Sequence, residues 1–296
     1  MKTTSKIKFI IKRNLPDFLF TFIKAIYNAT IAKSISVVFT LRAYNFKKET
    51  LINLNYFGFS YKLYINPKNG YLDKWLYVYK CYETHILKEI MNNIKKGDTV
   101  LDIGANIGHH SLFISKVVGD KGNVISFEPI SFLREQFEKS TSINKSANVT
   151  VMPLALGEKE SKETIHICES NTAGSSIVNF SAVGKKESIK VVTLDSLSLN
   201  PSFMKIDVEG YEYFVLKGAE ETIKKNHPKI LLEYSPLYYA KTNPSHQKEI
   251  ITFLRNNNYD IYDLDEERKK IVDDVDFISS FNQGFKAQTN ILCVQK

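Results

Sequence analysis

The chain has only three cysteines, and none of them lies in a metal-binding or disulfide-rich pattern. Cys81, Cys168 and Cys293 are far apart, and they form no CxxC pair and no cluster with histidine. This spacing argues against a zinc site and against a disulfide framework. Unpaired cysteines of this kind are typical of a reducing compartment, so we expect a cytoplasmic protein.

Long hydrophobic runs are also missing. Lys24, Lys33 and Arg42 interrupt the apolar stretches near the N-terminus. No stretch there reaches the roughly 18 residues that a membrane-spanning helix needs. The same interruptions argue against a cleaved signal peptide. No internal repeat or low-complexity tract is present, and the 43% hydrophobic and 12% aromatic content predicts a folded globular protein.

Basic charge is scarce outside the N-terminal region. Residues 1–48 contain ten lysines and arginines and one acid, Asp17. Subtracting these from the chain's 40 basic and 32 acidic residues leaves 30 and 31 in the other 248, a net charge of −1. A nucleic-acid groove needs a basic surface, so we expect no nucleic-acid partner for the main domain.

The hydrophobic pattern changes along the chain and predicts three regions. Residues 1–49 form a basic arm whose apolar positions recur at helical spacing over 15–32. Residues 50–98 alternate like a strand pair and then return to helical spacing from Glu83. In residues 99–296, short apolar runs alternate with helical segments. That alternation predicts an α/β fold with a mostly parallel sheet, and two further strands interrupt it within 157–193.

A glycine-containing turn follows the first of these apolar runs, in "VLDIGANIG". Gly104 and Gly108 allow the backbone to turn sharply and to approach a ligand, and the next helix offers free N–H groups. The dinucleotide motif GxGxxG is absent, because no glycine stands at the middle position. Asp102 precedes the turn, and a carboxylate there tolerates a cationic sulfonium better than a pyrophosphate. The turn therefore favours S-adenosylmethionine (SAM) over a dinucleotide.

An acid at the end of the second apolar run fits the same cofactor. Glu128 ends "NVISFE", twenty residues after Gly108. A carboxylate at this position can accept hydrogen bonds from both ribose hydroxyls. Because NAD and SAM both carry ribose, Glu128 by itself does not choose between them.

Three segments in this order resemble the FkbM family of SAM-dependent methyltransferases, over about residues 83–296. They are "VLDIGANIGHHSL", "FEP" and "MKIDVEGYEYFVLKGAEETI" followed by "HPKILLE". The resemblance implies a class I (Rossmann-like) sheet of seven strands, with "NILCVQK" as its antiparallel last strand. It also implies O-methylation, often of a sugar hydroxyl on a glycan, a glycolipid or a natural product, as in polysaccharide biosynthesis.

The resemblance also implies roles for individual residues. The turn would surround the methionine end of SAM with Asp102, Gly104, Ala105, Asn106 and Gly108. Glu128 would hold the ribose, and Ala155, between Leu154 and Leu156, would flank the adenine. Asp207, after the fourth strand, would face the transferred methyl group.

Two acids at neighbouring strand ends are the candidate catalytic residues. Asp207 ends "FMKID" and Glu233 ends "KILLE", so both are expected in one crevice. Such a pair suits either a base with a raised pKa or the ligands of Mg²⁺. We expect a metal-free site, because few oxygen ligands are visible. His109, His110 and Glu212 are expected to be structural.

Two other functions fit parts of the same pattern. One is a non-catalytic scaffold that binds SAM or a nucleotide, and the other is an NAD-linked oxidoreductase. The complete set of loop, ribose acid and strand-end acids favours the methyltransferase. The acceptor and the oligomeric state are not encoded in any motif that we recognise.

The sequence pattern of the N-terminal arm predicts that it binds peripherally to the inner face of an anionic membrane. The arm joins a hydrophobic stripe over Leu15–Tyr27 to a preceding basic cluster, Lys2, Lys6, Lys8, Lys12 and Arg13. Each basic residue near an anionic leaflet contributes about 1 kcal/mol, and apolar burial adds to this. The alternative is a helix that packs on the catalytic domain.

Deleting residues 1–33 separates these two roles of the arm. For a membrane arm, we expect the truncated protein to stay folded and to lose sedimentation with anionic liposomes, and salt should weaken binding of the full chain. Truncation that unfolds the domain, or a full-length protein that ignores the liposomes, would identify the arm as a structural cap.

Overall fold

We describe a computed structural model of residues 49–168, 174–178, 184–282 and 288–296. The predicted helix over 15–32 and the basic arm lie outside these residues. The chain divides at Lys47, and the unit from Lys48 to Lys296 is described here by itself. Within the described residues, no helix combines the length and the apolar character needed to cross a bilayer.

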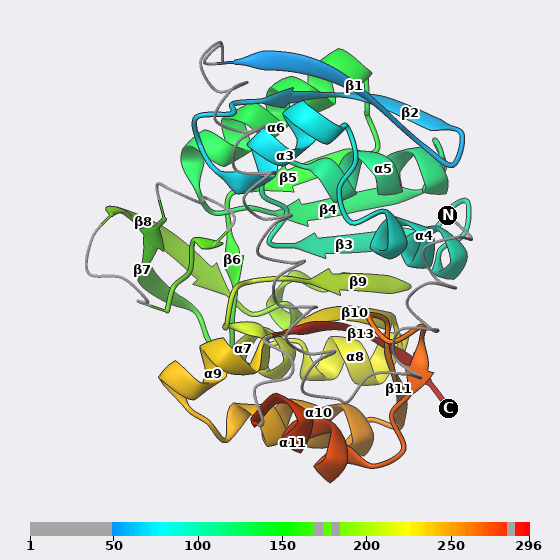
Figure 1. Ribbon diagram of the computed structural model, residues 1–296, viewed down its shortest axis with the longest axis vertical. Helices are drawn as coiled ribbons and strands as arrows, with labels where there is room; N and C mark the ends of the chain where they lie inside the picture. Colours follow the sequence, from blue (N-terminus) through cyan, green and yellow to red (C-terminus); the bar gives the residue numbers. More distant parts are fainter. Residues whose placement is uncertain (1–48, 169–173, 179–183, 283–287) are drawn as a thin grey trace, which may run out of the picture. The chain divides into compact units, whose positions relative to one another are not determined.

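The unit is built around an eight-stranded sheet with the order β12-β11-β13-β10-β9-β3-β4-β5 (Figure 1). Its strands are β3 (Thr99–Ile103), β4 (Asn123–Phe127), β5 (Val149–Met152), β9 (Phe203–Ile206), β10 (Lys229–Tyr234), β11 (Tyr259–Asp263), β12 (Lys269–Lys270) and β13 (Thr289–Gln295). Neighbouring strands from β5 to β10 are parallel, and β13 is antiparallel to β10 and β11. The predicted α/β sheet and its antiparallel last strand are confirmed, with the two-residue β12 as an additional edge strand.

Helices cover both faces of this sheet. They are α3 (Tyr71–Tyr79), α4 (Thr84–Asn93), α5 (His109–Val118), α6 (Ser131–Asn144), α7 (Glu212–Lys217), α8 (Glu220–Asn226), α9 (Pro236–Thr242), α10 (His246–Asn256) and α11 (Asp274–Asn282). Successive strand residues enter different cores: Val100 packs with α5 and α6, and Leu101 packs with α7, α8 and α10. Burial on both faces explains why these strands are mostly apolar, with Asp102 in β3 and Lys205 in β9 as exceptions.

A hairpin formed by β1 (Thr50–Tyr56) and β2 (Phe59–Ile65) shares the core of α5 and α6. Its alternate residues are buried, as the sequence pattern predicts. Edge groups of β2 also bond to α6: the Tyr64 N–H donates to Ser140 Oγ at 3.0 Å, and the Lys62 N–H donates to Asn144 Oδ1 at 2.8 Å. Residues 50–98 thus contribute to the core of the sheet domain.

A smaller sheet lies at the end toward which β3, β4 and β9 point (Figure 1). It has the order β6-β8-β7 and consists of β6 (Ala155–Leu156), β7 (Ser161–Ile167) and β8 (Lys185–Val192). The two additional strands predicted within 157–193 are therefore present as β7 and β8, which pair antiparallel.

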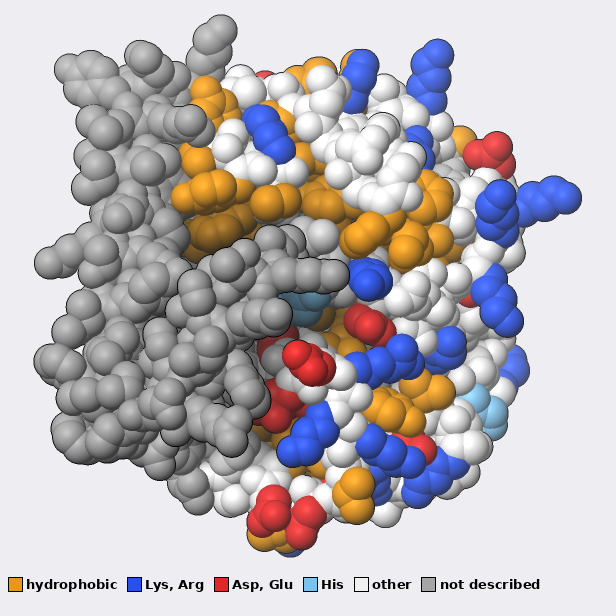
Figure 2. Space-filling view, turned by 45° about the vertical axis from the view of Figure 1, so that its right-hand side comes forward, with side chains coloured by type: hydrophobic (Ala, Val, Ile, Leu, Met, Phe, Trp, Pro, Cys, Tyr) orange, Lys and Arg blue, Asp and Glu red, His pale blue; other side chains and the backbone are white. Residues whose placement is uncertain are grey.

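On the face shown in Figure 2, basic side chains are interspersed with acidic, apolar and polar ones.

Candidate active site

The glycine turn connects β3 to α5 and folds across the end of β4. Gly104, Asn106 and Gly108 all have positive φ, at 82°, 53° and 83°. The N–H groups of Gly104 and Ala105 both donate to the carbonyl of Phe127. The turn is therefore fastened to the carboxyl end of the neighbouring strand.

Packing within the protein requires glycine at both positions. A Cβ atom at Gly104 would overlap the backbone carbonyl of Asp207, and one at Gly108 would overlap the ring of Phe137. The sequence analysis attributed these glycines to sharp turning and to ligand approach. Their positive φ confirms the sharp turning, and the structure adds close contact with the residue after β9 and with α6. Approach to a ligand stays a prediction.

Glu128 lies at the end of β4 and is 4% exposed. Its Oε2 accepts the N–H of Asn106 and its Oε1 accepts the N–H of Ile130, both at 2.8 Å. Burial raises the pKa of this carboxyl to about 7, against the lowering effect of the two backbone bonds. Each oxygen retains a further lone pair for a ligand donor, so the residue can hold the turn and a ribose together.

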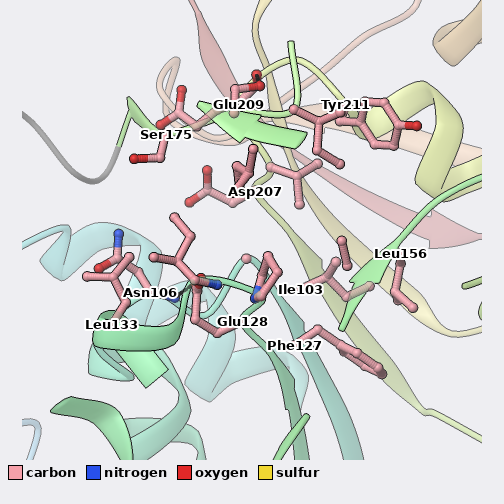
Figure 3. A pocket seen from close by; sticks show the side chains of 18 of the residues that line it. Ile103, Asn106, Phe127, Glu128, Leu133, Leu156, Ser175, Asp207, Glu209 and Tyr211 are labelled. Atoms are coloured by element: carbon pink, nitrogen blue, oxygen red, sulfur yellow. Dashed lines mark hydrogen bonds between the residues drawn. The ribbon is translucent and has the colours of Figure 1, made fainter. Parts of the chain in front are cut away.

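A pocket opens between this turn and the smaller sheet (Figure 3). Five of the residues predicted to bind the cofactor line it: Gly104, Asn106, Glu128, Ala155 and Asp207. In Figure 3 the carboxylate of Asp207 lies across the pocket from Asn106, while apolar side chains gather toward Leu156. One polar end and one apolar end suit a ligand that has an amino-acid end and an aromatic base.

Three predicted cofactor residues do not line the pocket. Asp102 is fully buried below the turn, and Ala105 and Gly108 face the core beside α5 and α6. The sequence analysis also missed apolar residues that do line it, namely Ile130, Leu133, Ile165, Ile177, Val208 and Tyr211. They come from loops, from the smaller sheet and, for Leu133, from the first turn of α6. No local sequence pattern specifies how these segments approach the pocket.

Lys205 connects Asp102 to Asp207 beneath the pocket. Its Nζ lies 2.9 Å from Asp207 Oδ2 and 3.8 Å from Asp102 Oδ1, and its side chain is 5% exposed. Burial opposes the charge on Lys205, but Asp207 and Asp102 outweigh that effect and raise its pKa above the ordinary value. Asp102 Oδ2 also accepts a hydrogen bond from Ser111. Sequence analysis missed Lys205, although a lysine inside the apolar run "FMKI" was a usable signal.

Three carboxylates meet where β9 and β10 end. Asp207, Glu209 and Glu233 each place one oxygen so that the three oxygens lie within 4.8 Å of one another. Glu209 has a φ of 53° and precedes Gly210 in the turn after β9. The predicted meeting of Asp207 and Glu233 is confirmed, and Glu209 joins them. This spacing also suits ligands of a divalent cation, so a metal-free site stays a prediction.

Burial and repulsion among its own acids raise the pKa values of Glu233 and Glu209 in this cluster. Glu233 is 8% exposed; its Oε1 accepts from Gln288 Nε2 at 2.9 Å and its Oε2 accepts from Ser235 Oγ at 3.3 Å. Burial, followed by repulsion from Asp207 and Glu209, raises the pKa of Glu233 well above its usual range. Burial and Asp207 also raise the pKa of Glu209 to about 8.

The residues expected to be structural have internal partners. The hydroxyl of Tyr61 lies 3.0 Å from His109 Nδ1, and His110 Nε2 lies 3.2 Å from the carboxylate of Glu83. Glu212 is fully buried and accepts the N–H groups of Val208 and Gly210, which shapes the turn that carries Glu209. Helix N-terminal acids often bond to backbone N–H groups in this way.

Serines 175 and 176 close one side of the pocket. Both residues line it, and Ser176 pairs with His166 of β7 through two backbone hydrogen bonds. The Ser176 hydroxyl also donates to the backbone carbonyl of Glu209 at 2.7 Å. The smaller sheet is thereby attached to the turn after β9, opposite the glycine turn.

The parallel sheet, its antiparallel β13, the glycine turn after β3 and the acid at the end of β4 define a class I methyltransferase fold, whose members use SAM. The family model described as "Methyltransferase FkbM domain" matches residues 102–261. The chain belongs to this family of methyltransferases.

Individual relatives match parts of the chain. Hexuronic acid methyltransferase AglP of Haloferax volcanii is 30% identical over 147 residues, which cover 48% of this chain and 58% of that protein. Protein-L-isoaspartate O-methyltransferase of Methanococcus aeolicus is 37% identical over 60 residues, 20% of this chain and 28% of that protein. A crystal structure of methyltransferase FkbM from Methylobacillus flagellatus is 20% identical, with a TM-score of 0.44, over 66% of this chain and 43% of that chain. The matches thus span less than two thirds of each relative.

Gly104→Ala tests the contact between the glycine turn and β9. The added methyl group has no space beside the Asp207 carbonyl, and the residue requires positive φ, so we expect a loss of more than about 2 kcal/mol of stability. Gly97→Ala is a matched control, because Gly97 has a φ of 90° but open space around its Cβ position. Equal losses of stability in the two variants by denaturant unfolding would contradict the packing explanation.

Glu128→Ala tests the ribose assignment. Removing an acceptor of charge-assisted bonds is expected to weaken SAM binding by about 2–3 kcal/mol, as measured by titration calorimetry. Glu187→Ala is the matched control, because Glu187 also accepts a backbone N–H at the start of α6 but does not line the pocket. Wild-type affinity in Glu128→Ala would refute the assignment.

Proposed function

We propose that the protein transfers the methyl group of SAM to a hydroxyl of a sugar in a glycan, a glycolipid or a glycosylated natural product. The observation that carries this proposal is the carboxylate cluster of Asp207, Glu209 and Glu233 beside the pocket. Membership of the FkbM family supports methyl transfer. The name of the Haloferax relative, a hexuronic acid methyltransferase, supports a sugar as acceptor.

The residues around the pocket fit SAM along its length. Glu128 has free lone pairs for the ribose hydroxyls, and apolar residues near Ala155 and Leu156 suit the adenine. Gly104, Asn106 and Asp207 would surround the methionine end. SAM supplies an already activated methyl group, so the protein mainly has to orient the acceptor and exclude water.

The acceptor hydroxyl needs a group that takes its proton, and Glu233 suits this role best. An alcohol is a weak nucleophile until its proton leaves. Asp207 is paired with the ammonium of Lys205, whereas Glu233 accepts hydrogen bonds from the neutral side chains of Gln288 and Ser235. In this arrangement Glu233 accepts the proton, while Asp207 stays paired with Lys205 beside the transferred methyl group.

Asp207→Asn and Glu233→Gln test these catalytic roles. Both changes preserve shape, and we expect each to lower kcat by more than about 100-fold while SAM affinity changes far less. Asp276→Asn, an exposed acid on α11, serves as the matched control. The readout is transfer of labelled methyl groups from SAM to glycan acceptors.

Two results would contradict this mechanism in different ways. Full activity in both Asp207→Asn and Glu233→Gln would exclude these acids from catalysis. Loss of activity with EDTA and recovery with Mg²⁺ would instead make the acids metal ligands.

A further inference from the structure

One face of α3 carries a row of aromatic side chains. Tyr71, Trp75 and Tyr79 follow one another at intervals of four residues, so they lie on the same side of the helix. The ring centroids of Tyr71 and Trp75 are 5.5 Å apart, and those of Trp75 and Tyr79 are 4.5 Å apart. Tyr71 is 46% exposed and Tyr79 is 37% exposed. The three rings therefore form one continuous, partly exposed aromatic surface, here called the α3 stripe.

A different set of residues anchors α3 to the domain. Leu72 and Leu76 are buried and belong to the core on the side of the sheet that carries α5 and α6 (Figure 1). Asp73 is also buried, and it accepts hydrogen bonds from the N–H of Asn66 and the side-chain amide of Gln136. The aliphatic residues thus face inward while aromatic rings remain at the surface. A contiguous row of exposed aromatic rings is a common sign of a binding surface.

The C-terminal end of α3 leads to the candidate active site. Three residues after Tyr79 comes Glu83, whose carboxylate lies 3.2 Å from His110 in the first turn of α5. Tyr82 lies between them in the chain. Burial raises the pKa of its phenol, and the negative charges of Glu83 and Asp207 raise it further. The α3 stripe therefore ends close to the side of the pocket where the acceptor hydroxyl has to sit.

Aromatic rings with polar edges suit a chain of sugar rings. One face of a pyranose presents C–H groups that pack on a flat aromatic ring, while phenol hydroxyls and the indole N–H can bond to sugar hydroxyls. A row of such rings offers a platform for several linked units, as aromatic platforms do for successive bases of a nucleic acid. The acid of this helix, Asp73, is buried, and Lys74 and Lys80 carry the other charges nearby. The stripe itself therefore repels neither a neutral nor an acidic sugar.

We propose that the α3 stripe binds the part of an acceptor glycan that extends beyond the methylated sugar, so that the protein prefers an oligosaccharide to a monosaccharide. The proposal rests on the function proposed above and narrows its substrate class. The α3 stripe lies before residues 102–261, which match the family model. The preference is therefore argued from this chain's own N-terminal elements and not from the matched domain.

The single tryptophan of the chain, Trp75, reports binding directly. The full-length protein is titrated with gluco-, manno-, galacto- and galacturono-oligosaccharides of increasing length, starting from each monosaccharide, while its tryptophan fluorescence is recorded. We expect at least one series to change the fluorescence, with a Kd that falls by about tenfold between the monosaccharide and the longest member. With labelled SAM, kcat/KM for methyl transfer should rise along the same series.

Three variants identify the stripe as the cause and keep Trp75 as the reporter. Tyr71→Ala removes one ring and should raise the Kd for the longest member by about tenfold. Tyr71→Phe keeps the ring and should retain most of the affinity. Phe57→Ala is the matched control and should leave the Kd unchanged, because Phe57 is 44% exposed but packs near Phe113 at the turn of the β1–β2 hairpin. The titration of the wild-type protein stands even where a variant fails to fold.

Four results would overturn the proposal. They are no fluorescence response to any series, equal Kd values for monosaccharide and longest member, an unchanged Kd in folded Tyr71→Ala, and methyl transfer that is independent of acceptor length. A fluorescence change on deleting residues 1–33, without any response to sugars, would identify the N-terminal arm as the occupant instead. Failure of the proposed function looks different: length-dependent binding without methyl transfer would support the stripe and refute sugar methylation.

Discussion

The buried ion pair between Lys205 and Asp207 is the interaction on which the candidate site depends. A lysine placed in the middle of a sheet is costly unless its charge is compensated, and Asp207 and Asp102 provide that compensation from adjacent strands. Through Lys205, these contacts join Asp102, near the end of β3, to Asp207, the residue after β9. The glycine turn begins directly after β3. Gly104 packs against the Asp207 carbonyl in this junction, so the backbone and the charges secure one geometry.

The elements before the sheet reach this junction through α5. The hairpin of β1 and β2 packs on α5, and the contact between Tyr61 and His109 lies at the first residue of that helix. The next residue, His110, meets Glu83, which directly precedes α4. Burial, together with the nearby ammonium of Lys205, lowers the pKa of His110 to about 4, so the imidazole is neutral at physiological pH. Residues 50–98 therefore hold the start of α5, the helix that follows the glycine turn.

The sequence predicted the parts of the site that depend on local pattern. Strand–helix alternation indicated the sheet, and the strand-end acids Asp207 and Glu233 meet because parallel strands end at one edge. Asp102 shows the limit of this reasoning. Its position in the motif suggests contact with the cofactor, but strand alternation turns its side chain toward Ser111 and Lys205. The residues contributed by the smaller sheet depend on long-range packing, which spacing along the chain does not encode.

Glu209 carries a consequence for the evolution of this protein. A glutamate with positive φ costs roughly 1–2 kcal/mol relative to glycine in the same backbone conformation. A glycine there would relax the turn, and with it the repulsion among three acids. Selection for stability alone would therefore remove this side chain. Retaining glutamate at this position therefore costs stability and keeps a third carboxyl group beside Asp207 and Glu233.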